Sequence, residues 1–461
     1  MARNLLILGH LLFLTMTNLL LFHENLLHER FLRTDLGALY QAIPFEALAA
    51  TIPAPKHSVS GKGRKPWLDV KGAIGLMILK HYLCMSDELL IERINTDWSM
   101  QLFCGIQLRA HERIADTNLP SSWRSYLAPH LNIDAMQKQL AHYWKPYMQQ
   151  TNIGMQDATC YESRITYPTD IKLLWQCCTQ TYNIMQQLRR KNKLRKSRCG
   201  YHKQRKVFLH YQKSRKKTKK QEKKLRKRLL KFLLRLLGLL GELQQKHSIR
   251  VPLKKECRLQ TIVKVYEQQH QKAYGNQTQI KDRIVSLSKP YIRPIVRGKE
   301  TKPVEFGAKV NKVLIDGISF IEHFSFDAFH EGNRLEQGIH LQRKLFGKCT
   351  HHSADGIYAT NANRRYCTSE HITTNFIPKG KQKPQHVHQA ATMRTALNQE
   401  RATRLEGSFG NEKNHYLLQK VNARNEHTEK CWIFFGILTS NASIISQRIT
   451  AQQTAGKIRA A

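Results

Sequence analysis

The sequence predicts an α/β domain that is interrupted by a basic helical insertion and preceded by an all-helical N-terminal domain. Three observations lead to this fold class. Apolar residues recur with a period of 3.6 through residues 69–94, as they do in helices. Lys and Arg fill 21 of the 40 positions of residues 189–228, with Glu222 as the single acid. Strand-like runs begin only near residue 280, after the basic segment.

The composition points to a polyanionic partner. The chain has 461 residues, 41% of them hydrophobic, which is enough for two or three domains with real cores. Its 75 Lys and Arg against 34 Asp and Glu give a formal net charge of +41. Nucleic acid is the natural partner, because each neutralised phosphate releases counterions. A membrane surface would satisfy the same charge, and ribosomal and packaging proteins share it. The ten cysteines form no Cys-x-x-Cys pair, which disfavours structural zinc and is typical of reduced cytoplasmic thiols.

The N-terminus has two interpretations. Leu5 to Phe22 is leucine-rich, but polar residues interrupt it and no small-residue cleavage site follows, so a secretion signal or membrane anchor is disfavoured. Met16 is a plausible true start, which would make residues 1–15 a mis-called extension. Residues 16–150 then form the helical N-terminal domain, with a linker at residues 51–65 rich in Pro, Gly, Ser and Lys.

Two helices are predicted in the middle of this domain, over residues 69–84 and 87–94, around a break at Met85-Ser86. A helix-turn-helix would lay its second helix in the major groove of DNA. A plain helical hairpin fits the same pattern. The sequence leaves both open.

Residues 185–279 are predicted to be a basic helical or coiled-coil insertion. After the basic run, apolar residues step by threes and fours, at positions 225, 229, 233, 236, 240 and 243. A solvated, partly disordered charge run is one interpretation. A contact to the phosphate backbone or a dimer arm is the functional one.

The α/β domain is predicted to comprise residues 151–184 and 280–447, followed by a tail at 448–461. Asp316-Gly317 between two apolar runs is a strong hairpin signal. Strands are expected at residues 283–287, 304–310, 313–321 and 372–377. Two more are expected near the aspartates, one just before Asp355 and one that ends at Asp157. Helices are expected at residues 331–345, 385–420 and 426–448.

Isolated carboxylates in this domain have the chemistry needed to cut DNA. Phosphodiester transfer benefits from two divalent ions, and Mg²⁺ prefers the hard oxygens of Asp and Glu. Asp157 and Asp355 stand where strands would deliver them to a sheet edge, although an Asp before Gly or Thr is commonly a turn former or cap. Asp316 is an alternative to Asp355 as the second aspartate of such a site. Glu406 lies two helical turns before Lys413, so a carboxylate and an ammonium share one face.

Several segments resemble a bacterial insertion-sequence transposase with a DDE catalytic triad. The resemblance covers most of the chain from Asn18 to about Gln447. The segments that carry it are Leu79-Lys-His-Tyr-Leu83 to Ile91-Glu-Arg-Ile-Asn-Thr-Asp-Trp98, Asp157-Ala-Thr, Ala354-Asp-Gly-Ile-Tyr358, Asn361-Ala-Asn-Arg-Arg-Tyr366 and Leu405-Glu-Gly-Ser-Phe-Gly-Asn-Glu-Lys413.

This resemblance implies an RNase H-like catalytic core and a helical N-terminal domain that binds the inverted terminal repeats. It implies that Asp157, Asp355 and Glu406 are the catalytic residues and hold two Mg²⁺ ions, with Mn²⁺ possible in vitro. DNA-binding residues are implied at Lys413, Arg401, Arg404, Arg364 and Arg365. The implied partners are double-stranded DNA, as element ends and as target, and a second copy in an end-pairing homodimer. The implied setting is the bacterial cytoplasm, at the nucleoid and not at a membrane.

The sequence departs from the family signature Tyr-x2-Arg-x3-Glu-x6-Lys at two positions. Glu406 and Lys413 fit it, but Gln399 and Ala402 stand where Tyr and Arg are expected, and Arg401 and Arg404 flank the gap. A lysine common after the second aspartate is here Gly356. A decayed transposase that folds but does not cut, a basic nucleic-acid-binding protein without catalysis, and a membrane-associated protein are therefore the competing hypotheses.

Overall fold

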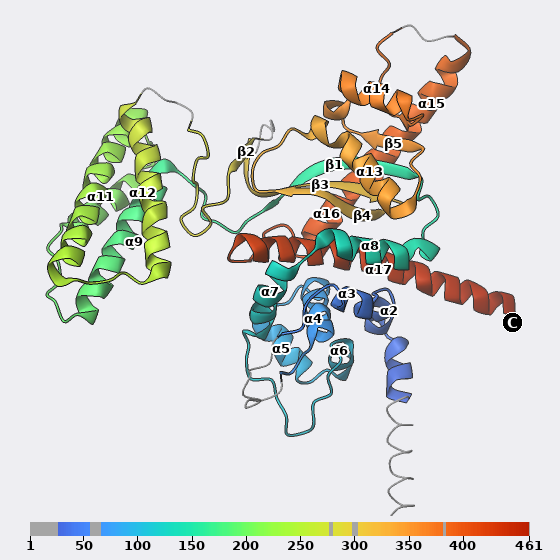
Figure 1. The fold of residues 1–461 in the computed structure, drawn as a ribbon, viewed down its shortest axis with the longest axis horizontal. Coiled ribbons are helices and arrows are strands. Elements are labelled where there is room, and N and C mark those ends of the chain that lie inside the picture. The colour runs from blue at the N-terminus through green and yellow to red at the C-terminus, as the bar shows by residue number, and fades with distance from the viewer. Residues whose placement is uncertain (1–25, 56–65, 276–279, 297–302, 381–383, 461) are drawn as a thin grey trace, which may run out of the picture.

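The computed structural model describes residues 26–55, 66–275, 280–296, 303–380 and 384–460. It has a helical N-terminal region, a mixed sheet covered by helices, and a separate helical unit beside the sheet (Figure 1). A helical N-terminal region followed by an α/β part confirms the coarse fold prediction. Leu5 to Phe22, Met16 and residues 56–65 of the predicted linker lie outside the described residues.

The N-terminal region is a packed cluster of short helices. Residues 26–32 are helical, and the helices that follow are α2 (Asp35–Gln41), α3 (Phe45–Ala49), α4 (Val70–Tyr82), α5 (Asp87–Ile94), α6 (Trp98–Phe103), α7 (Leu119–His130), α8 (Ile133–Trp144) and the short η1 (Lys145–Tyr147). Asp69 and Ser86 accept backbone N–H bonds at the starts of α4 and α5, as helix-capping residues do. The predicted break between these two helices is confirmed, with Cys84 at a positive φ of 54°.

Within the described residues, the sheet has six strands: β1 (Ile153–Glu162), β2 (Pro294–Val296), β3 (Val304–Ile315), β4 (Ile318–Ser325), β5 (His351–Ala354) and β6 (Thr373–Thr374). Its order is β2-β3-β1-β5-β6, and β4 pairs with β3. β1, β3 and β4 are antiparallel neighbours, whereas β5 and β6 run parallel to β1. The result is a mixed sheet with β1 near its centre.

The structure corrects two strand predictions and confirms the predicted hairpin. Asp157 lies in the middle of β1, which continues to Glu162, so the prediction that the strand ends at Asp157 was wrong. Residues 283–287 lie outside the strands of the described chain, because this segment packs irregularly against the helical unit. The hairpin at Asp316-Gly317 is confirmed: both residues have positive φ, 49° and 82°, as a tight turn between β3 and β4 requires.

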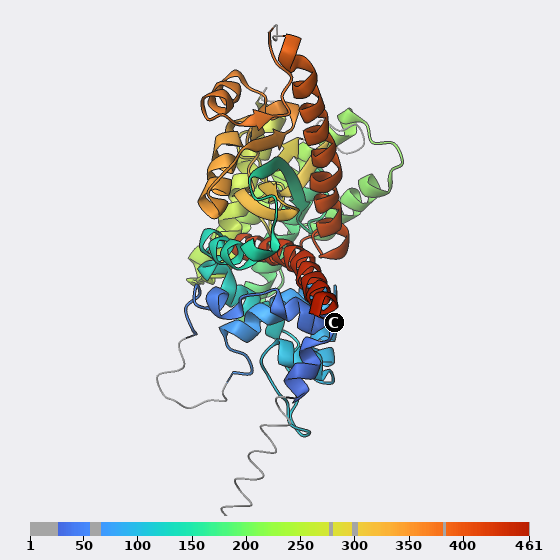
Figure 2. The ribbon, with the colours of Figure 1, turned by 90° about the vertical axis from the view of Figure 1, so that its right-hand side faces the viewer.

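Helices cover both faces of the sheet. They are α13 (Leu335–Phe346), α14 (Asn361–Ser369), α15 (Pro384–Glu400), α16 (Glu406–His415) and α17 (Glu426–Ala460), with short turns at η2 (Glu331–Arg334) and η3 (Gly356–Tyr358). Side chains alternate along β1, so Gln156 meets α13 while Tyr161 meets α16 on the opposite face. α15 and α16 run along one side of the sheet in Figure 2. α17 extends through the predicted tail to Ala460.

α17 joins the sheet to the N-terminal helices, as Figure 1 shows. The Asn441 amide donates to the backbone oxygen of Ser319 on β4 at 2.8 Å and accepts from its N–H at 2.9 Å. Gln137 of α8 pairs in the same way with Ile321, at 3.0 and 2.6 Å. These amides occupy the backbone groups along the open side of β4, which protects this edge strand from pairing with another chain.

The helical unit consists of α9 (Asp170–Lys191), α10 (Tyr201–Lys213), α11 (Lys219–His247) and α12 (Leu253–Tyr274), between β1 and β2 in the chain. It has its own apolar core, in which Leu229, Leu233 and Leu236 of α11 are fully buried. Asp170 is buried at its base and contacts Arg226, Lys272 and Arg283 at 3.1, 2.6 and 2.8 Å. Burial alone would raise the pKa of Asp170, but Lys272, Arg283 and the hydrogen bond from Gln269 lower it below its ordinary value.

None of the described helices is both long and apolar enough to cross a bilayer.

Candidate functional site

A cavity of about 740 Å³ lies at the sheet and brings several predicted site residues together. It is built from β1, the segment after β5, the turn before α13, and the helix that contains Arg401 to Lys413. Its lining includes Asp157, Thr159, Lys309, Glu331, Asp355, Arg401, Glu406 and Lys413. Residues far apart in the sequence therefore form one polar site.

The register of the sheet explains why the two aspartates meet. β1 and β5 are parallel neighbours, and their last paired residues are Gln156 and Ala354. Asp157 and Asp355 each follow directly, so both project from the same level of the sheet. Asp355 accepts a hydrogen bond from the N–H of Gly356 at 2.7 Å and caps the start of η3, which confirms its predicted place just before a turn.

Asp157 is a carboxyl group of the cavity with a strongly raised pKa. Burial raises its pKa to about 6, and the nearby charges of Glu331 and Asp355 add to this increase. Its bond from the N–H of Ala158, at 2.8 Å, and the charge of Arg401 oppose the rise. A carboxylate that is buried beside other acids is stabilised by an added cation.

Arg401 lies between two of the predicted triad members. One of its Nη atoms is 3.7 Å from Asp157 Oδ2 and 4.0 Å from Glu406 Oε1, and its side chain is 18% exposed. Residues Arg401–Leu405 (η4) form a π-helical turn between α15 and α16, an arrangement frequent at functional sites. Glu406 is more open, with 61% of its side chain exposed.

Lys413 approaches the same face of β1. Its Nζ donates to Thr159 Oγ1 at 2.8 Å and lies 5.7 Å from the centre of the Tyr161 ring. Asp157, Thr159 and Tyr161 share this face because side chains alternate along a strand. Lys413 thus holds a positive charge beside the acidic part of the cavity.

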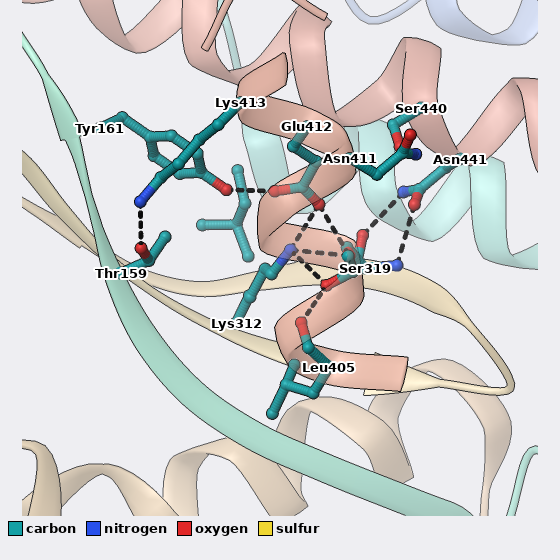
Figure 3. A network of polar contacts seen from close by, with 12 residues as sticks. Thr159, Tyr161, Lys312, Ser319, Leu405, Asn411, Glu412, Lys413, Ser440 and Asn441 are labelled. Atoms are coloured by element: carbon teal, nitrogen blue, oxygen red, sulfur yellow. Dashed lines mark hydrogen bonds and ion pairs between the residues drawn. The ribbon is translucent and has the colours of Figure 1, made fainter. Parts of the chain in front are cut away.

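A buried network fixes the helix that carries Glu406 and Lys413 (Figure 3). Lys312 of β3 and Glu412 of α16 form an ion pair at 0% and 1% exposure. The Tyr161 hydroxyl also donates to Glu412, and Ser319 donates to it at 3.0 Å. Lys312 further contacts Ser408 Oγ at 3.1 Å. Sequence spacing gave no signal for this network, because its members lie on four separate elements, β1, β3, β4 and α16.

Other predicted residues lie elsewhere. Arg404 pairs with Glu400 at 3.3 Å, and Arg364 donates to the carbonyl oxygen of Ile377 at 2.6 Å, so neither they nor the neighbouring Arg365 line the cavity. Asp316, the competitor for the second aspartate, binds Arg448 at 2.8 Å and the N–H of Gln149 at 2.9 Å, and serves the hairpin.

Two further cavity residues had no sequence signal. Glu331 and Lys309 form an ion pair of 2.7 Å at the cavity wall. Glu331 is the first residue of the short turn η2 and Lys309 lies within a strand, and neither position has a recognisable spacing to the aspartates. The contact exists only because β3 brings Lys309 to the turn before α13.

The oxygen ligands suit a hard divalent cation in their chemistry, but they are spread around the cavity. Within the described residues, no three His, Cys, Asp or Glu side chains converge closely enough to hold a metal ion. Instead, the guanidinium of Arg401 lies between Asp157 and Glu406. The donor chemistry therefore matches Mg²⁺ or Mn²⁺, but the carboxylates as arranged do not form a metal site.

One comparison with known proteins gives a match, and it covers the N-terminal part of the chain. Residues 24–126 match the model of a transposase domain, DUF772. This segment comprises the N-terminal helical region up to most of α7. No curated protein and no solved structure matches the chain. The match supports a transposase family for this protein, and such a family suggests a DNA-cleaving enzyme.

Proposed function

We propose that the protein is a DDE transposase of a bacterial insertion sequence, which binds the terminal inverted repeats, cleaves DNA and transfers the freed strand to a target. The observation that carries this proposal is the cavity that brings together Asp157, Asp355, Glu406 and Lys413. They come from three separate stretches of chain, namely β1, the residue after β5, and α16, yet they line the same cavity. The transposase-domain match at residues 24–126 supports the same class independently.

The sheet topology supports an RNase H-like core. Three antiparallel strands, β4, β3 and β1, continue into the parallel strands β5 and β6. The first proposed aspartate lies on β1 and the second directly follows β5. In this view the helical unit, α9 to α12, interrupts the core between β1 and the remaining strands.

In the proposed reaction, water attacks a phosphodiester at the element end and releases a 3′-hydroxyl and a 5′-phosphate. The 3′-oxygen then attacks a target phosphodiester, expels the target 3′-oxygen and gives its proton to solvent. Two divalent ions held by Asp157, Asp355 and Glu406 would supply activation of the attacking oxygen and charge for the leaving oxygen. Lys413 and Arg401 would bind the phosphate oxygens beside the cut.

The N-terminal helices would bind the terminal repeats, although α5 by itself is poorly suited to the major groove of DNA. Its exposed positions include Glu88 and Glu92, which repel phosphates, and Asp87 is paired with Lys80 at 2.7 Å. This arrangement favours the plain helical hairpin over a helix-turn-helix. Because two ends must be joined, we expect a homodimer on double-stranded DNA.

The test is cleavage in vitro of a DNA fragment that holds this reading frame and its native flanks, with Mg²⁺ and separately Mn²⁺. We expect metal-dependent cuts at the flanking repeats, abolished by Asp157→Asn, Asp355→Asn and Glu406→Gln. Glu336→Gln is the matched control, because Glu336 is exposed on α13 and does not line the cavity. Equal activity of a triad variant and this control would contradict the assignment.

The departures at Gln399 and Ala402 favour a second candidate, a transposase remnant that binds DNA without cutting it. Salt-sensitive DNA binding by the wild type without any metal-dependent cut would select this remnant or a basic packaging protein. Sequence preference for the flanking repeats would then separate the remnant from the packaging protein.

A further inference from the structure

A second, strongly basic groove lies on the helical unit, at α11 beside α10. It has a volume of about 410 Å³. Its polar lining is formed by Gln204, Lys224, Lys227, Arg228, Lys231 and Arg235. The described residues of this lining include no carboxylate.

The pattern of α11 produces this charge. Lys224, Arg228, Lys231 and Arg235 follow one another at helical spacing, so they form one stripe over roughly three turns, about 16 Å. All four are exposed, whereas the opposite stripe of leucines is buried against α9 and α12. The helix is therefore anchored by one face and presents a fixed row of cations on the other.

Two acids of the helical unit, Glu222 and Asp170, are already paired with cations. Glu222 pairs with Arg226 at 2.5 Å, and Arg226 in turn contacts the buried Asp170. Within the groove, Arg228 donates to Gln204 at 2.8 Å, which orients its guanidinium without cancelling the charge. The remaining field along the stripe is positive, so an anion is the ligand that it favours.

The groove suits a phosphate backbone better than bases. Base stacking needs an exposed aromatic surface, but the aromatic residue of this groove, Phe232, is 5% exposed and packs in the core. A row of long cationic side chains that repeats at each turn matches a chain of phosphates, which carries charge at regular short intervals. A duplex presents such a row without requiring its strands to open.

We propose that this groove is a second DNA-binding site, which holds the phosphate backbone of duplex DNA independently of base sequence. This proposal rests on the proposed function, since it adds a contact to the same DNA outside the bond that is cut. The cavity would position the reacting phosphate, and the groove would neutralise several phosphates of the flanking duplex.

The test is binding of a short labelled duplex that lacks the terminal repeats, measured by fluorescence anisotropy between about 50 and about 200 mM salt. The full chain is compared with a fourfold variant, Lys224→Gln, Arg228→Gln, Lys231→Gln and Arg235→Gln. A matched control changes two Lys and two Arg that are exposed but do not line the groove, namely Arg190, Lys191, Arg250 and Lys254. Circular dichroism checks that both variants fold.

We expect the groove variant to bind about 100-fold more weakly at low salt, with a salt slope smaller by about 3 to 4, because each phosphate contact contributes about 0.9. The control should stay within a few-fold of wild type. Equal losses in both variants, no binding of the duplex by wild type, or a groove-dependent preference for single-stranded RNA or anionic vesicles would each overturn the proposal.

This assay does not depend on cleavage. Groove-dependent duplex binding by a protein that never cuts would leave the groove assignment intact and refute the enzyme. Cleavage by wild type together with unchanged duplex binding by the groove variant would support the enzyme and refute the groove assignment.

Discussion

The buried pair of Lys312 and Glu412 gives the sharpest test of the site architecture. Lys312→Met removes the cation while keeping a side chain of similar length. Glu412 would then be a carboxylate at 1% exposure that retains only the neutral donors Tyr161 and Ser319. Removing one partner of a buried ion pair costs about 3–5 kcal/mol. We therefore expect the free energy of unfolding at pH 7 to fall by that amount.

A double substitution separates charge from packing. Adding Glu412→Gln removes the uncompensated charge while leaving an oxygen acceptor for Tyr161, so about 1–3 kcal/mol should be recovered relative to the sum of the single effects. The assay is urea unfolding followed by tryptophan fluorescence and circular dichroism for wild type, both single variants and the double variant. A strictly additive result, or a cost below about 1 kcal/mol for Lys312→Met, would refute the coupling.

Burial raises the pKa of Asp157 from 3.8 to about 6, so the folded state is penalised for ionising it. The penalty is absent below pH 3.8, grows from there to about 6 and is complete above it. Asp157→Asn should thus stabilise the protein by up to about 3 kcal/mol at pH 8 and by progressively less towards pH 4, as unfolding across this range would record; a constant difference would argue against the perturbed carboxyl. For the two candidate arginines, Arg401→Ala should slow cleavage about 10- to 100-fold, whereas Arg404→Ala should have little effect because Arg404 does not line the cavity. Measured single-turnover rates with the opposite order would show that Arg404 is the phosphate ligand.

Local chemistry in the sequence predicted the elements that depend on short-range signals. Asp316-Gly317 specified its hairpin because positive φ favours such residues, and the break predicted at Met85-Ser86 lies directly before α5. The strand predicted over residues 283–287 failed because an apolar run alone does not specify a pairing partner. The end of β1 was misplaced because its continuation after Asp157 depends on β3, which is distant in sequence.

The candidate site was predictable only in part. Asp157, Asp355, Glu406 and Lys413 were chosen by family resemblance, and the structure brings them to one cavity. Their catalytic role stays a prediction. Glu331 and Lys312 could not have been found, because each gains its place through tertiary contacts between separate elements.

The π-helical turn at Arg401–Leu405 also bears on how this sequence should be aligned with others. One residue inserted into an α-helix rotates everything beyond it by about 100°, but a wider turn accommodates the extra residue locally. Here Arg401, five positions before Glu406, still reaches it, although a fixed-spacing signature would look four positions before it and find Ala402. A search by constant spacing would discard this chain as defective, whereas an alignment that allows a one-residue insertion at this turn would retain its arginine.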